Sequence, residues 1–477
     1  MSNCICHLNG YEIKDATARR KMAELEDLFV LPTEEAVGKY LFEHPELTTT
    51  VQDGELTESM FSDELKIRAI KDYVTPHMFG AVGDGVTDDT EALNLAVNNV
   101  LGLPVNLCGK TYKTDQINVR NNTIVFNGYL IGESSETRSN VFFIDTEYDI
   151  RFELDNVHYT VSREHSVLTF TEDTDDKSSN VTFLHNNESN SDVVVRNCYV
   201  SGCEYAVKVS NAYGSLFIDN CKFTDCLMPI YTASVNFNII NSHIESVASY
   251  ELYHAFYLYM VQETPGVYGR IENCVFKSNA EVTFQAYNPN RTDDGHKIRN
   301  IDVHNCTFLY GDDYGLALSY NDVLVNFYNC RLKVMYSGIY KNCYIAGISK
   351  PYYVRITGSE IVLKVGPSII DKTECFKIEN SSIVADGLTS YMFVLNTSTS
   401  EIRGCTIHVM VQKTIFKVLN DAKLILIGNE IKHDFTNMQL IDGNTIPTTA
   451  SATILNNITN FSADKIPFDH NISGAAL

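Results

Sequence analysis

The sequence predicts an all-β protein built around a parallel β-helix, a solenoid of stacked coils. Three observations predict it: a repeating unit, two apolar columns within that unit, and Asn or Gly at a fixed position between the columns. Segments such as VRNCYV, IDNCKF and IENCVF carry the repeat, and ten of them align. Their Asn or Gly falls at Asn197, Asn220, Asn241, Asn273, Asn305, Asn329, Gly358, Asn380, Gly404 and Gly428. The steps of 21 to 32 residues match one solenoid coil, which buries its core only by stacking on its neighbours.

The columns of the repeat predict which side chains face the core. Each unit is apolar two residues before the Asn or Gly and three residues after it, and in six of ten units the residue just after is Cys. Alternate side chains share a face of a strand, so we expect this Cys and the apolar residue two positions on to point inward together. Asn and Gly enter left-handed backbone conformation at low cost, which predicts a corner between strands. We expect stacked buried thiols, not metal ligands, at Cys198, Cys221, Cys274, Cys306, Cys330 and Cys405.

The solenoid is predicted to span residues 105–435. Weaker copies of the unit occur upstream, at Gly128 in VFNGYLI and at Asn156 in ELDNVHY. Residues 170–180, FTEDTDDKSSN, interrupt the repeat, and we expect a solvated acidic loop there rather than a calcium site. Residues 436–477 match no coil, so we expect a C-terminal cap or a segment between subunits.

Residues 74–104 are predicted to form the start of the β-helix and a helix that caps its open core. In GAVGDGVTDDTEALNLAVNNV, Asp88 can cap the helix with Glu91 three positions on, and acids suit the positive end of the helix dipole. A phosphate-binding loop is disfavoured because acids open the helix. The apolar stripe of the helix needs a partner, and the open end of the solenoid is the available one. Its members are Leu93, Ala96, Val97 and Val100.

Residues 1–73 are predicted to form a small helical segment ahead of the solenoid. Ala18, Met22, Leu25 and Phe29 are spaced 4, 3 and 4 residues apart, the a/d rhythm of a short coiled coil, and Pro32 ends the pattern. The same spacing fits an amphipathic helix that lies on its own domain, so both interpretations stay open.

The composition disfavours several classes of function. The chain has 37 basic and 60 acidic residues and a net charge of −23, which argues against binding to nucleic acid. A polyanionic glycan would therefore need a local basic pocket. The start, MSNCICHLNG, has no signal-peptide pattern and no apolar run approaches the length of a membrane span, so we expect no membrane insertion. The thirteen cysteines, odd in number, favour reduced thiols and folding in a cytoplasm.

The first hundred residues are similar to a known group of proteins. LNGYEIKDATARRKMAEL, FEHPELTTTVQDGELTE and MFGAVGDGVTDDTEAL resemble tail-spike and tail-fibre proteins of phages and prophages of Firmicutes. The last piece resembles the first motif of the pectate-lyase-like β-helix found in tailspikes, which implies a right-handed solenoid. The resemblance also implies a homotrimer, docking of residues 1–73 on other tail or baseplate proteins of a virion, and a shaft that faces the host surface. The GDGxxDDT motif is specific to the fold and says little about substrate.

Three longer steps between units, of 32, 32 and 29 residues, mark coils with insertions, where we expect the binding surface. The chain has no Trp, so stacking on sugar rings would fall to Tyr and Phe. In HAFYLYM, alternation places Tyr257 and Tyr259 opposite Phe256, Leu258 and Met260, and thus outward, toward a ligand or toward a neighbouring loop or subunit. Arg331 and Lys333 can hold an acidic sugar. The predicted substrate-binding residues are Tyr257, Tyr259, Arg291, His296, Tyr314, Arg331 and Lys333.

The candidate catalytic groups are Asp293, Asp312 and Asp313. Glycoside hydrolysis needs two carboxylates that flank the bond, and these aspartates lie about one coil apart. GDDYGLAL resembles the paired-aspartate motif of polygalacturonase-type β-helix hydrolases, but no Gly-His-Gly follows in the next coils. A lyase would instead need a base, with His254 and His296 among the candidates. Otherwise the aspartates are turn residues on a solvated face.

No cofactor and no metal are expected. Cys4, Cys6 and His7 resemble a fragment of a metal site that a trimer could complete threefold, but the chain supplies no further ligands.

Three functions stay open. The preferred one is a tail spike or fibre, located in the virion tail and assembled in the host cytoplasm, that binds host surface polysaccharide during adsorption. The second is a polysaccharide depolymerase, a hydrolase or a lyase, on the same scaffold. The third is a secreted cellular enzyme of the pectate-lyase-like type, which the missing export signal disfavours.

Overall fold

The computed structural model describes two short N-terminal strands and most of the solenoid. The described residues are 7–8, 11–12, 73–100, 102–133, 139–144, 149–162, 181–187, 190–210, 214–233, 235–247, 254–259, 268–278, 282–287, 299–310, 323–332, 353–363, 368–371, 375–385, 393–396, 399–410, 414–419, 421–434, 440–442, 451–455 and 457–459.

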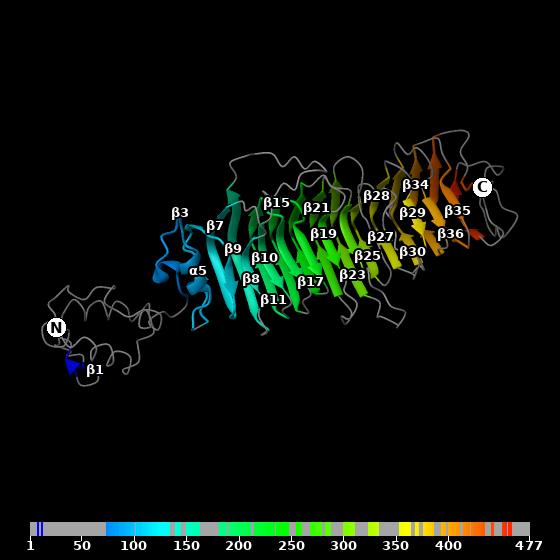
Figure 1. The fold of residues 1–477 in the computed structure, drawn as a ribbon. Coiled ribbons are helices and arrows are strands. Elements are labelled where there is room, and N and C mark those ends of the chain that lie inside the picture. The colour runs from blue at the N-terminus through cyan, green and yellow to red at the C-terminus, as the bar shows by residue number, and fades with distance from the viewer. Residues whose placement is uncertain are drawn as a thin grey trace, which may run out of the picture.

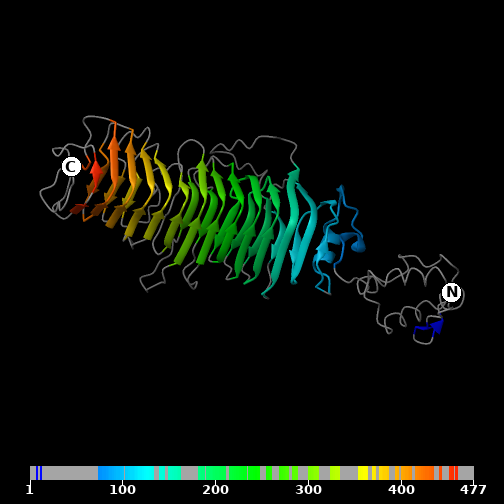
Figure 2. The same ribbon diagram turned by 180° about the vertical axis from the view of Figure 1, so that it is seen from behind.

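The chain forms a right-handed parallel β-helix, as predicted, in an elongated stack of coils (Figures 1 and 2). Strands of successive coils pair in parallel and build three faces. The first face precedes the Asn or Gly corner, the second follows it, and the third closes the coil. In the coil around Asn220 these faces hold β14 (Ser215–Asp219), β15 (Lys222–Cys226) and β16 (Ile230–Ala233), respectively.

Two long strands, β7 (Thr123–Glu133) and β9 (Arg151–Ser162), run through the corner and join the first and second faces. The other first-face strands are β4 (Val105–Asn106), β11 (Asp192–Arg196), β14, β17 (Asn236–Ile240), β20 (Tyr268–Glu272), β23 (Arg299–His304), β25 (Val323–Tyr328), β27 (Tyr353–Thr357), β30 (Cys375–Glu379), β33 (Thr399–Arg403), β36 (Lys423–Ile427) and β38 (Ser451–Leu455).

The second face continues the coils after the corner. Its other strands are β3 (Asp84–Asp88), β5 (Thr111–Lys113), β12 (Tyr199–Ser201), β15, β18 (His243–Ser246), β21 (Val275–Ser278), β24 (Thr307–Tyr310), β26 (Arg331–Leu332), β28 (Glu360–Leu363), β31 (Ser382–Ala385), β34 (Thr406–Val409), β37 (Glu430–His433) and β39 (Ile458–Thr459).

The third face consists of a seven-stranded sheet and a three-stranded sheet. The seven-stranded sheet holds β6 (Ile117–Val119), β8 (Ser139–Ile144), β10 (Val181–Asn187), β13 (Tyr205–Ser210), β16, β19 (His254–Tyr259) and β22 (Val282–Tyr287). The three-stranded sheet holds β29 (Ser368–Asp371), β32 (Phe393–Asn396) and β35 (Phe416–Leu419).

All ten predicted corners have left-handed backbone. The φ angles are 49° to 54° at the seven asparagines and 62° to 63° at the three glycines. The asparagines also donate from coil to coil: Asn220 Nδ2 lies 2.7 Å from Asn197 Oδ1, and Asn273 Nδ2 lies 3.2 Å from Asn241 Oδ1. The corner therefore combines a backbone preference with a side-chain ladder.

The predicted upstream corner at Gly128 is wrong by one residue. The left-handed residue is Asn127, with φ of 60°, and Gly128 takes the inward position that follows it. A Cβ atom at Gly128 would lie 2.3 Å from the Cβ atom of Leu107, so close packing at this coil excludes a side chain. Asn156 is a corner as predicted, with φ of 54°.

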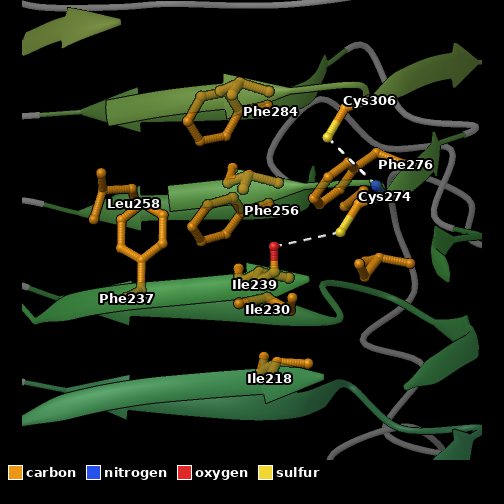
Figure 3. Packing of buried hydrophobic residues seen from close by; sticks show 14 of the residues in the cluster. Ile218, Ile230, Phe237, Ile239, Phe256, Leu258, Cys274, Phe276, Phe284 and Cys306 are labelled. Atoms are coloured by element: carbon orange, nitrogen blue, oxygen red, sulfur yellow. Dashed lines mark hydrogen bonds between the residues drawn. The ribbon is translucent and has the colours of Figure 1, made fainter. Parts of the chain in front are cut away.

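The cysteine column is buried, as predicted (Figure 3). The Cys274 thiol donates to the Ile239 carbonyl oxygen at 3.5 Å, and the Cys274 amide donates to the Cys306 sulfur at 3.4 Å. Burial raises the pKa of the Cys330 thiol to about 11. Aromatic rings stack beside the thiols, with Phe256 and Phe284 5.0 Å apart between ring centroids. The core is thus a set of columns that run along the solenoid axis.

A helix caps the N-terminal end of the core, but it begins later than predicted. α5 spans Thr90–Val97 with Asp89, not Asp88, at the N-cap. The Asp89 carboxylate accepts the amides of Val82 and Gly83, at 2.7 and 2.9 Å, and so ties down the Gly-rich loop instead of the helix end. Asp88 accepts the Thr90 amide at 3.0 Å. The predicted pairing of Asp88 with Glu91 is therefore wrong.

The apolar stripe of α5 is shorter than predicted. Leu93, Ala96 and Val97 are 1% exposed or less, and they pack on the first coils, where α5 lies at the end of the stack (Figure 1). Val100 is 86% exposed, because the helix ends at Val97 and the chain turns away. The helix is a lid on the solenoid core, as expected.

The solenoid continues beyond residue 435. β38 pairs in parallel with β36, and β39 pairs with β37, so one further coil stacks where the sequence predicted a cap or a segment between subunits. Asn457 occupies the position of the cysteine column in this coil and donates to the Leu426 carbonyl oxygen at 2.9 Å. The predicted boundary is therefore too early.

At the N-terminus, β1 (His7–Leu8) and β2 (Tyr11–Glu12) pair in antiparallel fashion. The predicted coiled-coil positions, residues 18–29, lie outside the described residues, as do Cys4 and Cys6. In the described part of the chain, no helix combines the length and the apolar character needed to cross a membrane.

Candidate functional site

A row of outward side chains crosses the seven-stranded sheet of the third face. Strand register places Phe143, His185, Lys208, Tyr231 and Tyr257 in line on β8, β10, β13, β16 and β19. All five are half-buried. We call these five residues, together with Tyr205 and Tyr259 beside them, the aromatic row.

Alternation along each strand produces the row. In β19 the side chains of Phe256 and Leu258 are fully buried and point into the core (Figure 3), whereas Tyr257 and Tyr259 are half-buried on the opposite side. The outward orientation predicted for these two tyrosines is confirmed. Their role in binding stays a prediction.

The rings of the row contact one another. The Tyr231 ring centroid lies 5.5 Å from that of Tyr257 and 6.4 Å from that of Tyr259, with planes 21° apart in the second pair. Tyr205 meets Tyr231 edge-on at 6.0 Å. Lys208 Nζ lies 4.8 Å from the Tyr205 centroid and 5.9 Å from that of Tyr231, which are cation–π distances. The row is therefore a packed platform and not a set of independent side chains.

Burial sets the protonation states within the row. It lowers the pKa of His185 to about 4, with a smaller effect of the Lys208 charge, and His185 Nδ1 lies 3.1 Å from Asn140 Oδ1. Burial and then Tyr259 raise the pKa of Tyr231 to about 12. At neutral pH the row therefore presents a neutral imidazole at His185 and a protonated phenol at Tyr231.

These groups can contact both the apolar and the polar surfaces of a ligand. Tyrosine rings offer apolar faces with polar hydroxyls, and the ammonium offers three donors. The seven residues of the row include no carboxylate, whereas hydrolysis of a glycosidic bond needs two. His254, a candidate base, is 4% exposed, and its ring packs 5.2 Å from that of Tyr257.

Most of the predicted site residues lie outside the described part of the chain. Only the backbone of Arg331 is described, in β26, in register with Thr307 and Glu360. Those outside are Asp293, Asp312, Asp313, Arg291, His296, Tyr314 and Lys333. Their proposed roles stay predictions.

The sequence analysis missed His185, Lys208 and Tyr231. A signal exists: together with Tyr257 they are spaced 23, 23 and 26 residues apart, which is one coil each. The distance from the corner to the third-face strand varies between coils, so a repeat aligned on the corner leaves this column unaligned.

Comparison with known proteins agrees with the fold. Residues 182–349 match the family model described as right handed beta helix region. No curated protein sequence matches the chain.

Solved structures similar to the chain come from viruses and bacteria. One is the enzymatically active domain of tailspike protein 2 of bacteriophage CBA120, at 12% identity over 82% of this chain and 52% of that one, with a TM-score of 0.39. Another is ORF18 of Geobacillus virus E2, at 15% identity over 76% and 61% of the two chains, with a TM-score of 0.36. A third is the catalytic unit of a GH87 alpha-1,3-glucanase from Streptomyces thermodiastaticus, at 10% identity over 83% and 71%, with a TM-score of 0.40.

The chain thus spans 52% of the tailspike domain and 61% of the ORF18 chain that it matches. Likeness at this level concerns the solenoid fold alone.

Proposed function

We propose that the chain is a tail-spike or tail-fibre protein of a phage or prophage that binds host surface glycans through the aromatic row. The observation that carries the proposal is the row itself: packed tyrosine rings around one lysine on an otherwise regular solenoid face. Sugar rings stack on such faces while their hydroxyls bond to the phenols. The similarity of residues 8–100 to tail proteins supports the virion setting.

The coil lengths support the same location. In the coils of 32 residues, the first- and second-face strands keep a short corner between them, as in β20 and β21, which are separated by residues 273–274. The extra residues flank the third-face strands, at 247–253 and 260–267 around β19 and at 288–298 after β22. Additional chain in a solenoid commonly serves the binding face.

Binding is tested with purified protein and bacterial capsular and wall polysaccharides. Tyr231→Ala and Tyr257→Ala should each weaken glycan binding by about three- to tenfold, since an aromatic contact contributes roughly 0.5–1.5 kcal/mol beyond its buried area. Tyr268→Ala is the matched control, because Tyr268 is 66% exposed on the first face. Equal losses for all three variants would contradict a site on the third face.

The same incubation separates adhesion from depolymerisation. New reducing ends would indicate a hydrolase, and ultraviolet absorbance of an unsaturated uronate would indicate a lyase. If either product appears, Asp293→Asn, Asp312→Asn and Asp313→Asn show whether the predicted carboxylates act. Binding without product would leave the protein an adhesin.

The virion setting has its own tests. Purified virions should contain the chain, and light scattering should give the mass of a trimer. Absence from virions would favour the secreted enzyme, and a monomer mass would contradict the trimer.

A further inference from the structure

We propose that Asn94 and Asn98 of α5 together act as a substitute β-strand, which closes the N-terminal edge of the third-face sheet against pairing with a second copy of the chain. This role is separate from that of the helix as a lid on the apolar core, and it does not depend on what the aromatic row binds. Two observations carry it: the hydrogen bonds of the two asparagines with the edge of the sheet, and the different way in which the other two faces end.

β6 lies at the N-terminal end of the seven-stranded sheet, and within the described residues it pairs with one strand, β8. An edge strand exposes N–H and C=O groups, which pair readily with a strand of another chain. Alternate residues of a strand direct these groups to the same edge, so the outer edge carries the backbone groups of residues 116, 118 and 120. This edge therefore needs acceptors for amides and donors for carbonyl oxygens.

The side-chain amides of Asn94 and Asn98 supply these partners. Asn94 Oδ1 accepts the Asn118 amide at 2.8 Å, and Asn94 Nδ2 donates to the Gln116 carbonyl oxygen at 3.0 Å. Asn98 Oδ1 accepts the Arg120 amide at 2.9 Å, and Asn98 Nδ2 donates to the Asn118 carbonyl oxygen at 2.6 Å. In a parallel sheet, a residue of the neighbouring strand accepts and donates in this same way. Each asparagine thus takes the place of one strand residue.

The spacing of the two asparagines suits this role. Residues four apart in an α-helix rise by about 6 Å along its axis, and alternate residues of a parallel strand rise by about 6.6 Å, so the two repeats match over one step. The other hydrogen of each Nδ2 group is used within the helix. Asn94 Nδ2 also donates to the Thr90 carbonyl oxygen at 3.0 Å, and Asn98 Nδ2 to the Asn94 carbonyl oxygen at 2.9 Å. The helix therefore holds both amides in the orientation that β6 requires.

The first and second faces end on backbone groups instead. On the first face, Val74 forms a parallel bridge with Val105 of β4. On the second face, β3 pairs in parallel with β5. The third face ends at a helix, whose backbone N–H and C=O groups bond along the helix axis and are not available to a strand beside it. Side-chain amides are the groups with which α5 can complete the sheet.

The substitute strand is tested by hydrogen exchange of single amides, measured by mass spectrometry with fragmentation to single residues. Asn94→Ala should speed the exchange of the Asn118 amide by about three- to tenfold, the size expected for one lost hydrogen bond, and leave the Arg120 amide nearly unchanged. Asn98→Ala should do the reverse. Each single variant is thus the matched control of the other.

Closure of the edge is tested with the double variant Asn94→Ala/Asn98→Ala. α5 then loses four hydrogen bonds to the sheet edge and should leave it more often. Two opened β6 edges can pair in antiparallel fashion about a two-fold axis, so the mass by light scattering should exceed that of the wild type and rise with concentration. Leu95→Ala, at a position of α5 that is 52% exposed, is the control and should keep the wild-type mass.

The outcomes separate the substitute strand from a general effect on stability. Equal acceleration of both amides in each single variant would overturn the substitute strand, because the asparagines would then only stabilise the helix. Unchanged exchange of both amides would overturn it as well. A double variant that keeps the wild-type mass at every concentration would refute closure against a second copy. If the double variant does not fold, the masses of the two single variants decide this point, with the same rise expected.

Discussion

Replacing Asn220 tests whether the left-handed corner, and not only the exposed side-chain ladder, stabilises the solenoid. Asn220 has φ of 51° and is exposed, and its Nδ2 donates to Asn197 Oδ1 at 2.7 Å. Both Asn220→Gly and Asn220→Ala remove this hydrogen bond, which contributes about 0.5–1 kcal/mol at an exposed site. Only Ala is also strained, by about 1–2 kcal/mol, in left-handed backbone.

Gly has its own cost, roughly 0.5–1 kcal/mol, from the freedom of the unfolded chain. We therefore expect the free energy of unfolding to fall by about 1.5–3 kcal/mol in Asn220→Ala and by about 1–2 kcal/mol in Asn220→Gly, so that the Gly variant is the more stable one. Asn236 is the matched control: it is exposed in β17, where its Oδ1 accepts the Tyr268 amide at 2.8 Å, and its φ is not positive. At position 236, the Ala variant should be more stable than the Gly variant.

The measurement is the midpoint of urea unfolding at fixed protein concentration, or the unfolding rate where refolding is incomplete. A coil contacts only its neighbours, but the loss is measurable if the stack unfolds as a unit. The decisive result is the reversal of order between the two positions. If Asn220→Ala is as stable as Asn220→Gly or more stable, backbone conformation does not explain the asparagine column. The side-chain ladder alone would then have to explain it.

Two thiols, a half-buried histidine and a corner glycine allow further tests. Among the thiols of known exposure, Cys108 is exposed and Cys330 is buried, so iodoacetamide should alkylate Cys108 but not Cys330 in the native protein. Peptide mass spectrometry measures the two alkylation rates, and equal rates would contradict the buried column. The pKa of His185 is lower in the folded than in the unfolded chain, because the side chain is buried in its neutral form. The unfolded chain therefore binds a proton first, and the protein loses stability as the pH falls from about 6.5 to 4. His185→Gln should remove this loss of stability, which is at most about 3 kcal/mol before solvent exposure is discounted. The measurement is the fall in urea midpoint between pH 7 and pH 4.5, which should be smaller in the variant than in the wild type. Gly404 has left-handed backbone with φ of 62°, so Gly404→Asn should keep the stability of the protein and Gly404→Ala should lower it by about 1 kcal/mol. Space allows either side chain, because only the Asn380 side-chain oxygen approaches the new Cβ atom, at 2.6 Å, and this oxygen can move. Equal urea midpoints for the two variants would contradict the prediction.

The corners and the core columns could be predicted from sequence because each depends on a single local property. Left-handed backbone selects Asn or Gly, and a buried inward position selects apolar residues or Cys, so both leave a mark in every coil. The failures have the same basis. In VFNGYLI two residues suited to the corner are adjacent, and only packing against Leu107 decides that Gly128 points inward. The last coil was missed because Thr459 stands where other coils have an apolar residue.

The aromatic row was not predicted as a whole, because only its spacing of one coil marks it in the sequence and no local property requires it. Outward positions of a strand accept almost any residue, so Lys208 and Tyr231 carry no fold signal of their own. Only the strand register makes them neighbours. Tyr257 was found because it lies in a strand with a clear alternation, between two inserted segments.

The three faces of the solenoid differ in how much freedom they leave for function. The first and second faces meet at the corner, where backbone conformation, the asparagine ladder and the inward columns all constrain the same few residues. A carboxylate or ring added there must fit the spacing of the next coil. The third face is joined to the others by segments of variable length, from residues 202–204 before β13 to residues 247–253 before β19. Insertions there leave the corner register unchanged, so a binding surface can vary on this face without disturbing the stack that supports it.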